Sequence, residues 1–434
     1  MYRHEYHQSL VYKIWLCGKP GKVVNTFEQV LEHIRRIHDQ TLGVPQICYL
    51  VGWQFEGHDS KYPAWSQVND RLKRPEDAHA VDSLHWLMRE AKRYNATVSL
   101  HINMCDAYES SPLWDEYVKS DLLVREADGA LKKGGIWGGE QSYLVCKTRE
   151  WADGQAKKRI DALLKLLPLA EVGTVHIDVF QPMPSPYHGV TREDEMRTIK
   201  SILAYWRSRQ IDVTAEWWHH DLVGLVPMVY HSNFDEASRL KYPPDLACGG
   251  GSAWNMRQPE SDSRPGGFSR LPEPGCLFEE AWGHSVDHDL HQDLAKFSEQ
   301  FYLRTLPFIF LNRFRALSHS QTAKTYEVQF SGDVWTQVHI ADRHLTIRQQ
   351  DRLVVDGSNV FLPAPWRKDR EYIAFSRRGG EMVWTVPPEW GATKRIHSRS
   401  LLGGGVEGAA TIANGILKCV LLPHNAIVVR PADE

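Results

Sequence analysis

Two acidic residues stand near the ends of apolar segments that have the composition of β-strands. Asp178 lies late in residues 174–179, and Glu216 lies late in residues 212–217. A buried carboxylate without a partner is costly, so each either has a structural partner or is kept for chemistry. A retaining glycosidase needs two carboxyl groups about 5–5.5 Å apart, one to attack the anomeric carbon and one to protonate the leaving oxygen. An apolar setting, such as the tryptophans that begin at Trp217, would raise the pKa of Glu216 toward the acid role.

More polar side chains follow other predicted strands. His101 lies near the end of the segment 97–102, and Asn103 directly follows it. His58 and Asp59 come soon after an earlier apolar run. Each alone could be a loop residue with its own partners. Their convergence at successive strand ends favours a site for a ligand rich in hydroxyl groups.

Aromatic residues are abundant, with 16 Trp and 16 Tyr among 434 residues. They serve either a large core or sugar binding, because aromatic rings stack on the C–H faces of pyranoses. Trp137 stands between two glycine pairs at 134–135 and 138–139. This pattern predicts a lid that can lay an indole over a ligand, with a surface turn as the alternative.

Metal and nucleophile motifs are missing. His219, His220 and Asp221 could suggest a metal site, but neighbouring histidines on a strand point to opposite faces, and there is no HExxH or paired CxxC. No GxSxG elbow occurs. We therefore expect neither a metal nor another cofactor.

The apolar pattern predicts the elements that position these residues. Thr26 and Gln29 form a capping box before the first helix. Helices are predicted over residues 27–37 and 80–91, from Thr191 onward, and over about 287–303. Strands are predicted over residues 11–16, 46–51, 97–102, 174–179, 212–217, 225–230, 276–281 and 306–311.

Alternation of strands and helices predicts an α/β fold with a parallel sheet. Eight units within residues 1–324 predict a catalytic (β/α)₈ TIM-type barrel, whose active site lies at the carboxyl ends of the strands. A doubly wound open sheet is the alternative, although no GxGxxG or GxxxxGK[ST] follows an early strand. In residues 325–434, short strand-like segments separated by turn signals at 356–357 and 379–380 predict a C-terminal all-β sandwich.

Charge and composition exclude some partners. A net charge of −3 provides no field for nucleic acid or an anionic membrane. No run approaches the roughly 18 apolar residues of a membrane helix. The first residues, MYRHEYHQSLVYKIWLC, lack a small-residue cleavage site, and the seven Cys are scattered, so we expect a cytoplasmic protein with a carbohydrate as its partner.

Several motifs together resemble glycoside hydrolase family 101, the endo-α-N-acetylgalactosaminidases. Their order and spacing are more specific than any one of them. The motifs are EGHDS (56–60), LHIN (100–103), AYESSP (107–112), HIDVF (176–180), AEWWH (215–219), AWGHS (281–285), VFLPAPW (360–366) and MVWTVPPEWG (382–391).

The resemblance implies a barrel with an appended β-sandwich, with Asp178 as the nucleophile and Glu216 as the acid/base. Asp59, His101 and Asn103 fall where the family contacts the terminal N-acetylgalactosamine. The implied reaction cleaves Galβ1-3GalNAc from Ser or Thr of mucin-type O-glycans with retention. The full set of substrate-binding candidates is Asp59, His58, His101, Asn103, Trp137, Trp217 and Trp282.

The sequence departs from the family in two ways. Family enzymes are typically large, with a β-domain before the barrel, and their lid usually offers two tryptophans one residue apart. Here the barrel begins almost at Met1, and Trp137 stands alone. The alternatives are an exo-acting α-N-acetylgalactosaminidase, an α-glycosidase for another hexose, and an inactive carbohydrate-binding barrel.

Overall fold

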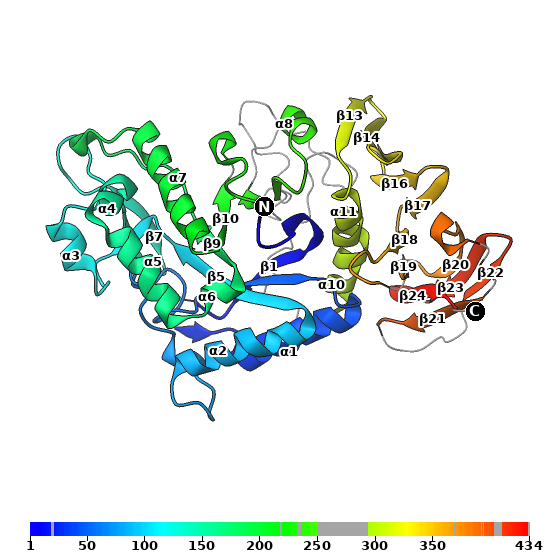
Figure 1. Ribbon diagram of the computed structural model, residues 1–434, viewed down its shortest axis with the longest axis horizontal. Coiled ribbons are helices and arrows are strands. Elements are labelled where there is room, and N and C mark those ends of the chain that lie inside the picture. Colours follow the sequence, from blue (N-terminus) through cyan, green and yellow to red (C-terminus); the bar gives the residue numbers. More distant parts are fainter. Residues whose placement is uncertain are drawn as a thin grey trace.

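The computed structural model describes most of the chain (Figure 1). The described residues are 1–18, 21–217, 219–231, 236–249, 294–368, 370–391, 393, 395–402 and 410–432. Trp282 and the strand predicted over residues 276–281 lie outside them.

The N-terminal part is built on a parallel sheet of the barrel type, as predicted. Among the described residues its order is β1-β4-β5-β9-β10-β11-β12, a half-barrel without pairing between β12 and β1. Side chains from both edges still meet, because Val11 of β1 and Cys248 of β12 belong to one buried cluster. The strands are β1 (Leu10–Trp15), β4 (Gln46–Val51), β5 (Ala96–Asn103), β9 (Thr174–Asp178), β10 (Asp212–Trp217), β11 (Met228–His231) and β12 (Cys248–Gly249).

Helices connect these strands and cover the sheet (Figure 1). Helix α1 begins as predicted, since Thr26 and Gln29 make both hydrogen bonds of a capping box. Its buried face includes Phe27, Val30 and Ile34. The helices of this part are α1 (Phe27–Gln40), α2 (Ala80–Ala91), α4 (Lys147–Asp153), α5 (Gln155–Leu166), α6 (Leu169–Val172), α7 (Arg192–Ser208) and α8 (Glu236–Lys241).

A small subdomain is inserted between β5 and α4. It contains a three-stranded antiparallel sheet in the order β6-β8-β7 and one short helix. Because β6 begins only three residues after β5 ends, this sheet adjoins the carboxyl edge of the main sheet. Its elements are β6 (Asp106–Tyr108), α3 (Trp114–Lys119), β7 (Lys133–Trp137) and β8 (Glu140–Leu144); a separate hairpin joins β2 (Cys17–Gly18) and β3 (Lys22–Val23).

The strand predicted over residues 306–311 is wrong, because this segment is the helix α11 (Leu306–Leu311). A short, wholly apolar run has no periodicity that separates a strand from a buried helix. It continues the helical α10 (Leu294–Gln300) and a π-helical turn (Phe301–Thr305), and Pro307 is tolerated in a first turn. All six residues of α11 are buried.

The C-terminal part is an antiparallel β-domain, as predicted. Among the described residues, nine strands pair in the order β13-β14-β15-β16-β17-β18-β19-β24-β21, and β20-β23-β22 form a smaller sheet packed on Phe361, Tyr372 and Ile427. The sheet already includes β13, which precedes residue 325. The strands are β13 (Ala316–Gln321), β14 (Thr325–Phe330), β15 (Val334–His339), β16 (His344–Gln349), β17 (Arg352–Asp356), β18 (Asn359–Pro363), β19 (Tyr372–Ser376), β20 (Gly380–Thr385), β21 (Ile396–Ser400), β22 (Ala410–Ala413), β23 (Ile416–Leu421) and β24 (Asn425–Pro431).

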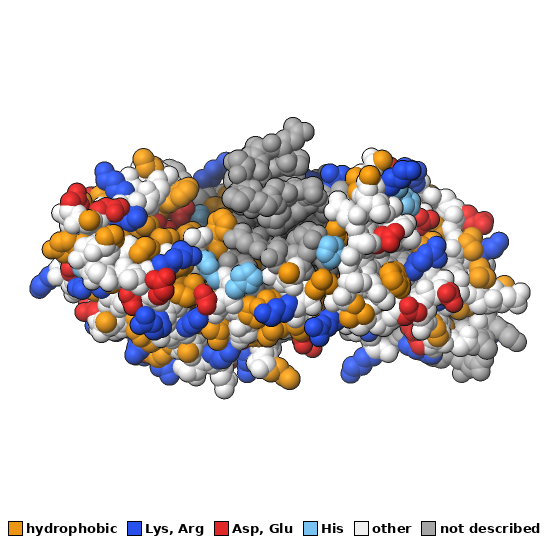
Figure 2. All heavy atoms as spheres, turned by 90° about the horizontal axis from the view of Figure 1, so that it is seen from above, with side chains coloured by type: hydrophobic (Ala, Val, Ile, Leu, Met, Phe, Trp, Pro, Cys, Tyr) orange, Lys and Arg blue, Asp and Glu red, His pale blue; other side chains and the backbone are white. Residues whose placement is uncertain are grey.

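The two parts share a packed junction. The rings of Tyr302 and Phe375 stack with centroids 4.9 Å apart, and the Trp366 indole N–H donates to the Leu42 carbonyl over 3.1 Å. On the face seen in Figure 2, acidic and basic side chains are interspersed. No helix among the described residues has the length and apolar character needed to cross a bilayer.

A buried ion pair ties the inserted subdomain to the barrel helices. Arg159 of α5 donates from Nε to Glu150 Oε1 over 2.8 Å, and the Tyr117 hydroxyl of α3 donates to the same oxygen. Arg159 also donates to the Pro63 carbonyl over 2.8 Å, in the loop that follows β4. This cluster therefore fixes one wall of the barrel mouth.

We predict that Arg159→Met lowers the free energy of unfolding by about 3–5 kcal/mol, because Glu150 is left charged and buried. Tyr117→Phe removes one hydrogen bond and costs about 1 kcal/mol. Urea unfolding measures both. Equal effects of the two substitutions would contradict the ion pair's role.

Candidate active site

The neighbouring strands β5, β9 and β10 carry polar residues at alternate positions. Since alternate residues of a strand point to the same side, these polar residues share one face of the sheet. Glu216 directly follows the paired residues Ala215 and Ile177, so it lies level with Asp178. The parallel register thus brings the two predicted carboxylates side by side. The paired positions are Asp212 with Thr174, Thr214 with His176 and His101, and Asp178 with Asn103.

Asp178 and Glu216 are in direct contact. Burial, the negative charge of Asp178 and a side-chain hydrogen bond between the two carboxyl groups all raise the pKa of Glu216. Their side chains are 10% and 16% exposed, so both still reach the opening of the barrel. The surroundings of Glu216 thus favour its protonated form, which can donate a proton to a ligand.

Two predicted residues hold Asp178. His101 Nε2 lies 3.5 Å from one carboxylate oxygen, and Asn103 Nδ2 donates to the other over 3.4 Å. Asn103 also donates to Asp106 over 2.7 Å and accepts from the backbone N–H groups of residues 105 and 106. Asn103 is thus fixed by its neighbours, and it orients Asp178.

Lys13 is a site residue that the sequence reasoning missed. It lies in β1 with its ammonium 3.5 Å from Glu216 Oε1, and its positive charge favours the carboxylate form of Glu216. The available signal was one Lys within the apolar strand VYKIW. His176 was missed as well; its imidazole contacts the His101 ring with centroids 5.1 Å apart, and its Nδ1 lies 2.9 Å from the Thr214 hydroxyl.

The loop after β4 brings His58 and Asp59 to the same mouth. Gly52 and Gly57 have positive φ and pack closely against the Cys17 carbonyl oxygen. A Cβ atom added to Gly52 or Gly57 would lie 1.9 or 2.7 Å from that oxygen. His58 Nε2 lies 3.2 Å from Asp59 Oδ2, and its ring meets the His101 ring edge-on with centroids 5.3 Å apart.

Both histidines at the mouth are uncharged near neutral pH. Burial, with the adjacent His101, lowers the pKa of His58 to about 3. Burial and the nearby Lys13 lower the pKa of His101 well below its ordinary value. Neutral imidazoles next to Asp178 can donate one hydrogen bond each without adding positive charge.

Backbone strain occurs beside the carboxylates. Val179 has φ of +43°, a rare conformation for a β-branched residue. Its N–H donates to Glu216 Oε2 over 3.3 Å. Strain of this kind costs on the order of 1–3 kcal/mol and concentrates at functional sites.

The three predicted tryptophans have different outcomes. Trp137 is 49% exposed and precedes Gly138 and Gly139, which have positive φ at the turn between β7 and β8. A Cβ on Gly134 of this hairpin would lie 3.3 Å from Asp106 Oδ1, so the hairpin adjoins the Asn103 network. Trp217 is half-buried at the end of β10, and Trp282 lies outside the described residues.

Among the described residues, two groups of side chains have donor atoms within 4.8 Å of one another, as a metal site requires. Imidazole and carboxylate ligands of this kind suit a divalent transition metal. The Lys13 ammonium already provides a positive charge next to Glu216, so a metal would compete with it. The groups are His101 with His176 and Glu216, and His58 with Asp59 and Asp178.

The sequence of this region matches a known family. Residues 4–222, just over half of the 434-residue chain, match the family 101 model, described as endo-alpha-N-acetylgalactosaminidase. The chain belongs to glycoside hydrolase family 101. The matched range includes both Asp178 and Glu216, and it confirms the resemblance that the sequence motifs indicated.

Similarity to individual proteins is consistent with this family. A protein of Renibacterium salmoninarum, provisionally named an endo-alpha-N-acetylgalactosaminidase, is 26% identical over 145 residues, which is 33% of this chain and 8% of that protein. Two solved structures of alpha-N-acetylgalactosaminidase NagBb from Bifidobacterium bifidum have a similar fold. They are a quadruple mutant (TM-score 0.57, 12% identity) and a GalNAc complex (TM-score 0.54, 11% identity). These matches cover 79% of this chain and 57% and 58% of those chains. They support the fold.

We predict opposite effects of two substitutions on the pKa of Glu216. Lys13→Met raises it, because the cation that favours the carboxylate is lost, and Asp178→Asn lowers it, because the adjacent negative charge is lost. The other titratable groups at Glu216, His101 and His176, are unchanged in both variants. Carboxyl ¹³C NMR titration of glutamate-labelled protein measures the pKa, with Glu216→Gln identifying the signal. Shifts in one common direction would contradict this arrangement.

Proposed function

We propose that the chain is a retaining α-glycosidase that hydrolyses α-linked N-acetylgalactosamine. The observation that carries this proposal is the contact between Asp178 and Glu216 at adjacent strand ends. Retaining enzymes hold their two carboxyl groups closer together than inverting enzymes do, about 5–5.5 Å against about 6.5–9.5 Å, so the close placement of Asp178 and Glu216 supports retention.

In the first step, Asp178 attacks the anomeric carbon while Glu216 gives its proton to the leaving oxygen. The raised pKa of Glu216 suits the acid role, and the hydrogen bond from Asn103, with the His101 imidazole 3.5 Å away, orients the Asp178 carboxylate. In the second step, Glu216 accepts a proton from water, which attacks the glycosyl–Asp178 ester. Lys13 stabilises the carboxylate form that this step requires.

The proposed substrate is Galβ1-3GalNAc linked to Ser or Thr, or a small related glycan. Family membership supports this choice. Asp59 and His58 lie at the mouth next to Asp178, where they can contact sugar hydroxyls. A second candidate is exo-acting cleavage of a single α-linked GalNAc, favoured by the one exposed tryptophan on the β7–β8 hairpin, Trp137.

We predict that Asp178→Ala lowers kcat/KM for aryl α-N-acetylgalactosaminides by a factor on the order of 10⁴ or more, because the nucleophile is lost. Glu216→Gln loses about 10²–10⁴-fold with poor leaving groups and much less with 2,4-dinitrophenol, which needs no proton. Steady-state kinetics across leaving groups measures the difference.

Glu193→Gln serves as the matched control, since it changes an exposed carboxyl group of α7 and keeps full activity. Turnover by both active-site variants at the wild-type rate would end the assignment. Glycan binding by the wild-type protein without release of sugar would instead identify a carbohydrate-binding barrel.

We also predict retention of configuration. The first sugar released from an aryl α-glycoside is the α-anomer, because two displacements occur at the same carbon. Proton NMR of the anomeric signal during early turnover identifies it. Initial formation of the β-anomer would exclude a glycosyl–Asp178 intermediate.

A further inference from the structure

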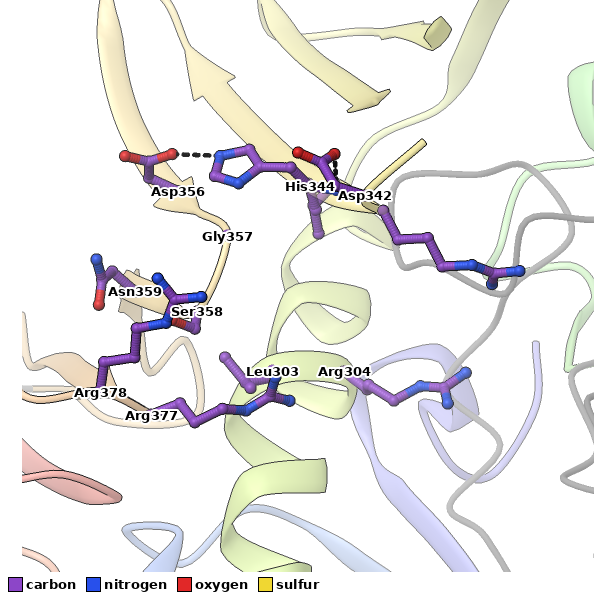
Figure 3. A pocket seen from close by; sticks show the side chains of 12 residues that line it. Leu303, Arg304, Asp342, His344, Asp356, Gly357, Ser358, Asn359, Arg377 and Arg378 are labelled. Carbon is purple, nitrogen blue, oxygen red and sulfur yellow. Dashed lines mark hydrogen bonds and ion pairs between the residues drawn. The ribbon is translucent and has the colours of Figure 1, made fainter. Parts of the chain in front are cut away.

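A cavity lies at the junction of the barrel and the β-domain, and the activity proposed above does not use it. Its volume is about 530 Å³, within the range of sites for small ligands. Leu303 of the π-helical turn forms one side (Figure 3). The turn between β17 and β18 and the residues after β19 form the other side, and His344 of β16 closes the top.

Hydrogen-bond donors face this cavity. Arg377 and Arg378 follow β19 and lie beside the β17–β18 turn, on the same side of the cavity (Figure 3). Within the described part of the chain, the Arg378 side chain has no ion pair or hydrogen bond, and neither has the Ser358 hydroxyl. Asn359 uses its carbonyl oxygen to accept from Ser376 over 2.7 Å, which leaves its amide N–H groups for a ligand.

Charged side chains of both signs line the cavity. Its lining includes four arginines and two aspartates. Both aspartates have partners of their own, since Asp356 lies 2.7 Å from a His344 nitrogen and Asp342 lies 2.8 Å from a His339 nitrogen. Arg377 pairs with Glu299 at its edge. The carboxylates are thus engaged, while Arg378 remains available for an anion.

We propose that this cavity binds a saccharide through a carboxylate or sulfate group on one of its sugars. A guanidinium matches the two oxygens of such a group with parallel N–H bonds, and Ser358 and Asn359 can hydrogen-bond neighbouring hydroxyls. The choice of a saccharide over another anion rests on the proposed function. The cavity would hold an acidic branch of the glycan or a second glycan chain.

The test is calorimetric titration of the full chain carrying Asp178→Ala, which prevents turnover. The probes are 3′-sialyllactose, galactose 6-sulfate, their neutral counterparts lactose and galactose, and inorganic sulfate. We expect an acidic sugar to bind at least tenfold more tightly than its neutral counterpart. Arg378→Ala should abolish that difference. Arg348→Ala, which removes an exposed arginine of β16 outside the cavity, should preserve it.

Equal affinity for acidic and neutral sugars would overturn the proposal, as would an unchanged preference in Arg378→Ala. Binding of inorganic sulfate as tight as that of the acidic sugars would identify an anion site without saccharide recognition and would also overturn it. Failure of the proposed glycosidase is distinguishable, because it appears as lost hydrolysis by the wild-type chain and leaves this titration unaffected.

Discussion

The central constraint in this structure is that two carboxyl groups touch inside a barrel mouth with little access to water. Two negative charges so close together repel each other, and burial adds a further penalty for each charge. The pKa of Glu216 rises as a result. Different neighbours separate the roles: Asn103 donates to Asp178 and His101 lies 3.5 Å from it, while Lys13 attracts the ionised form of Glu216.

The fold supplies this contact through strand register. Parallel strands end at one edge, and the pairing of β9 with β10 sets Glu216 level with Asp178. Below the carboxylates, the same face carries His176 and Thr214, whose side chains lie 2.9 Å apart. Tyr49 and Thr174 form a further hydroxyl contact of 2.7 Å deeper in the barrel. The site therefore rests on polar side chains that have partners of their own, and helices outside the sheet provide the apolar core.

Much of this arrangement could be predicted from the sequence. The capping box at Thr26 and the strands that contain Asp178 and Glu216 follow from local patterns, because periodicity and caps act within a few residues. Residues 306–311 could not be assigned from pattern, since an all-apolar run suits both a strand and a buried helix. Lys13 was missed for another reason: its partner Glu216 is distant in sequence, and only the closing of the sheet brings them together.

The account depends most on Asp178 acting as the nucleophile. In Glu216→Gln, a 2,4-dinitrophenyl α-N-acetylgalactosaminide should load the enzyme quickly, while the second step is slow without a general base. Mass spectrometry of the quenched variant, followed by peptide mapping, should find one N-acetylhexosamine on the peptide that contains Asp178. A sugar attached to a different carboxylate, or turnover in which no covalent adduct ever accumulates and the product is inverted, would contradict the account.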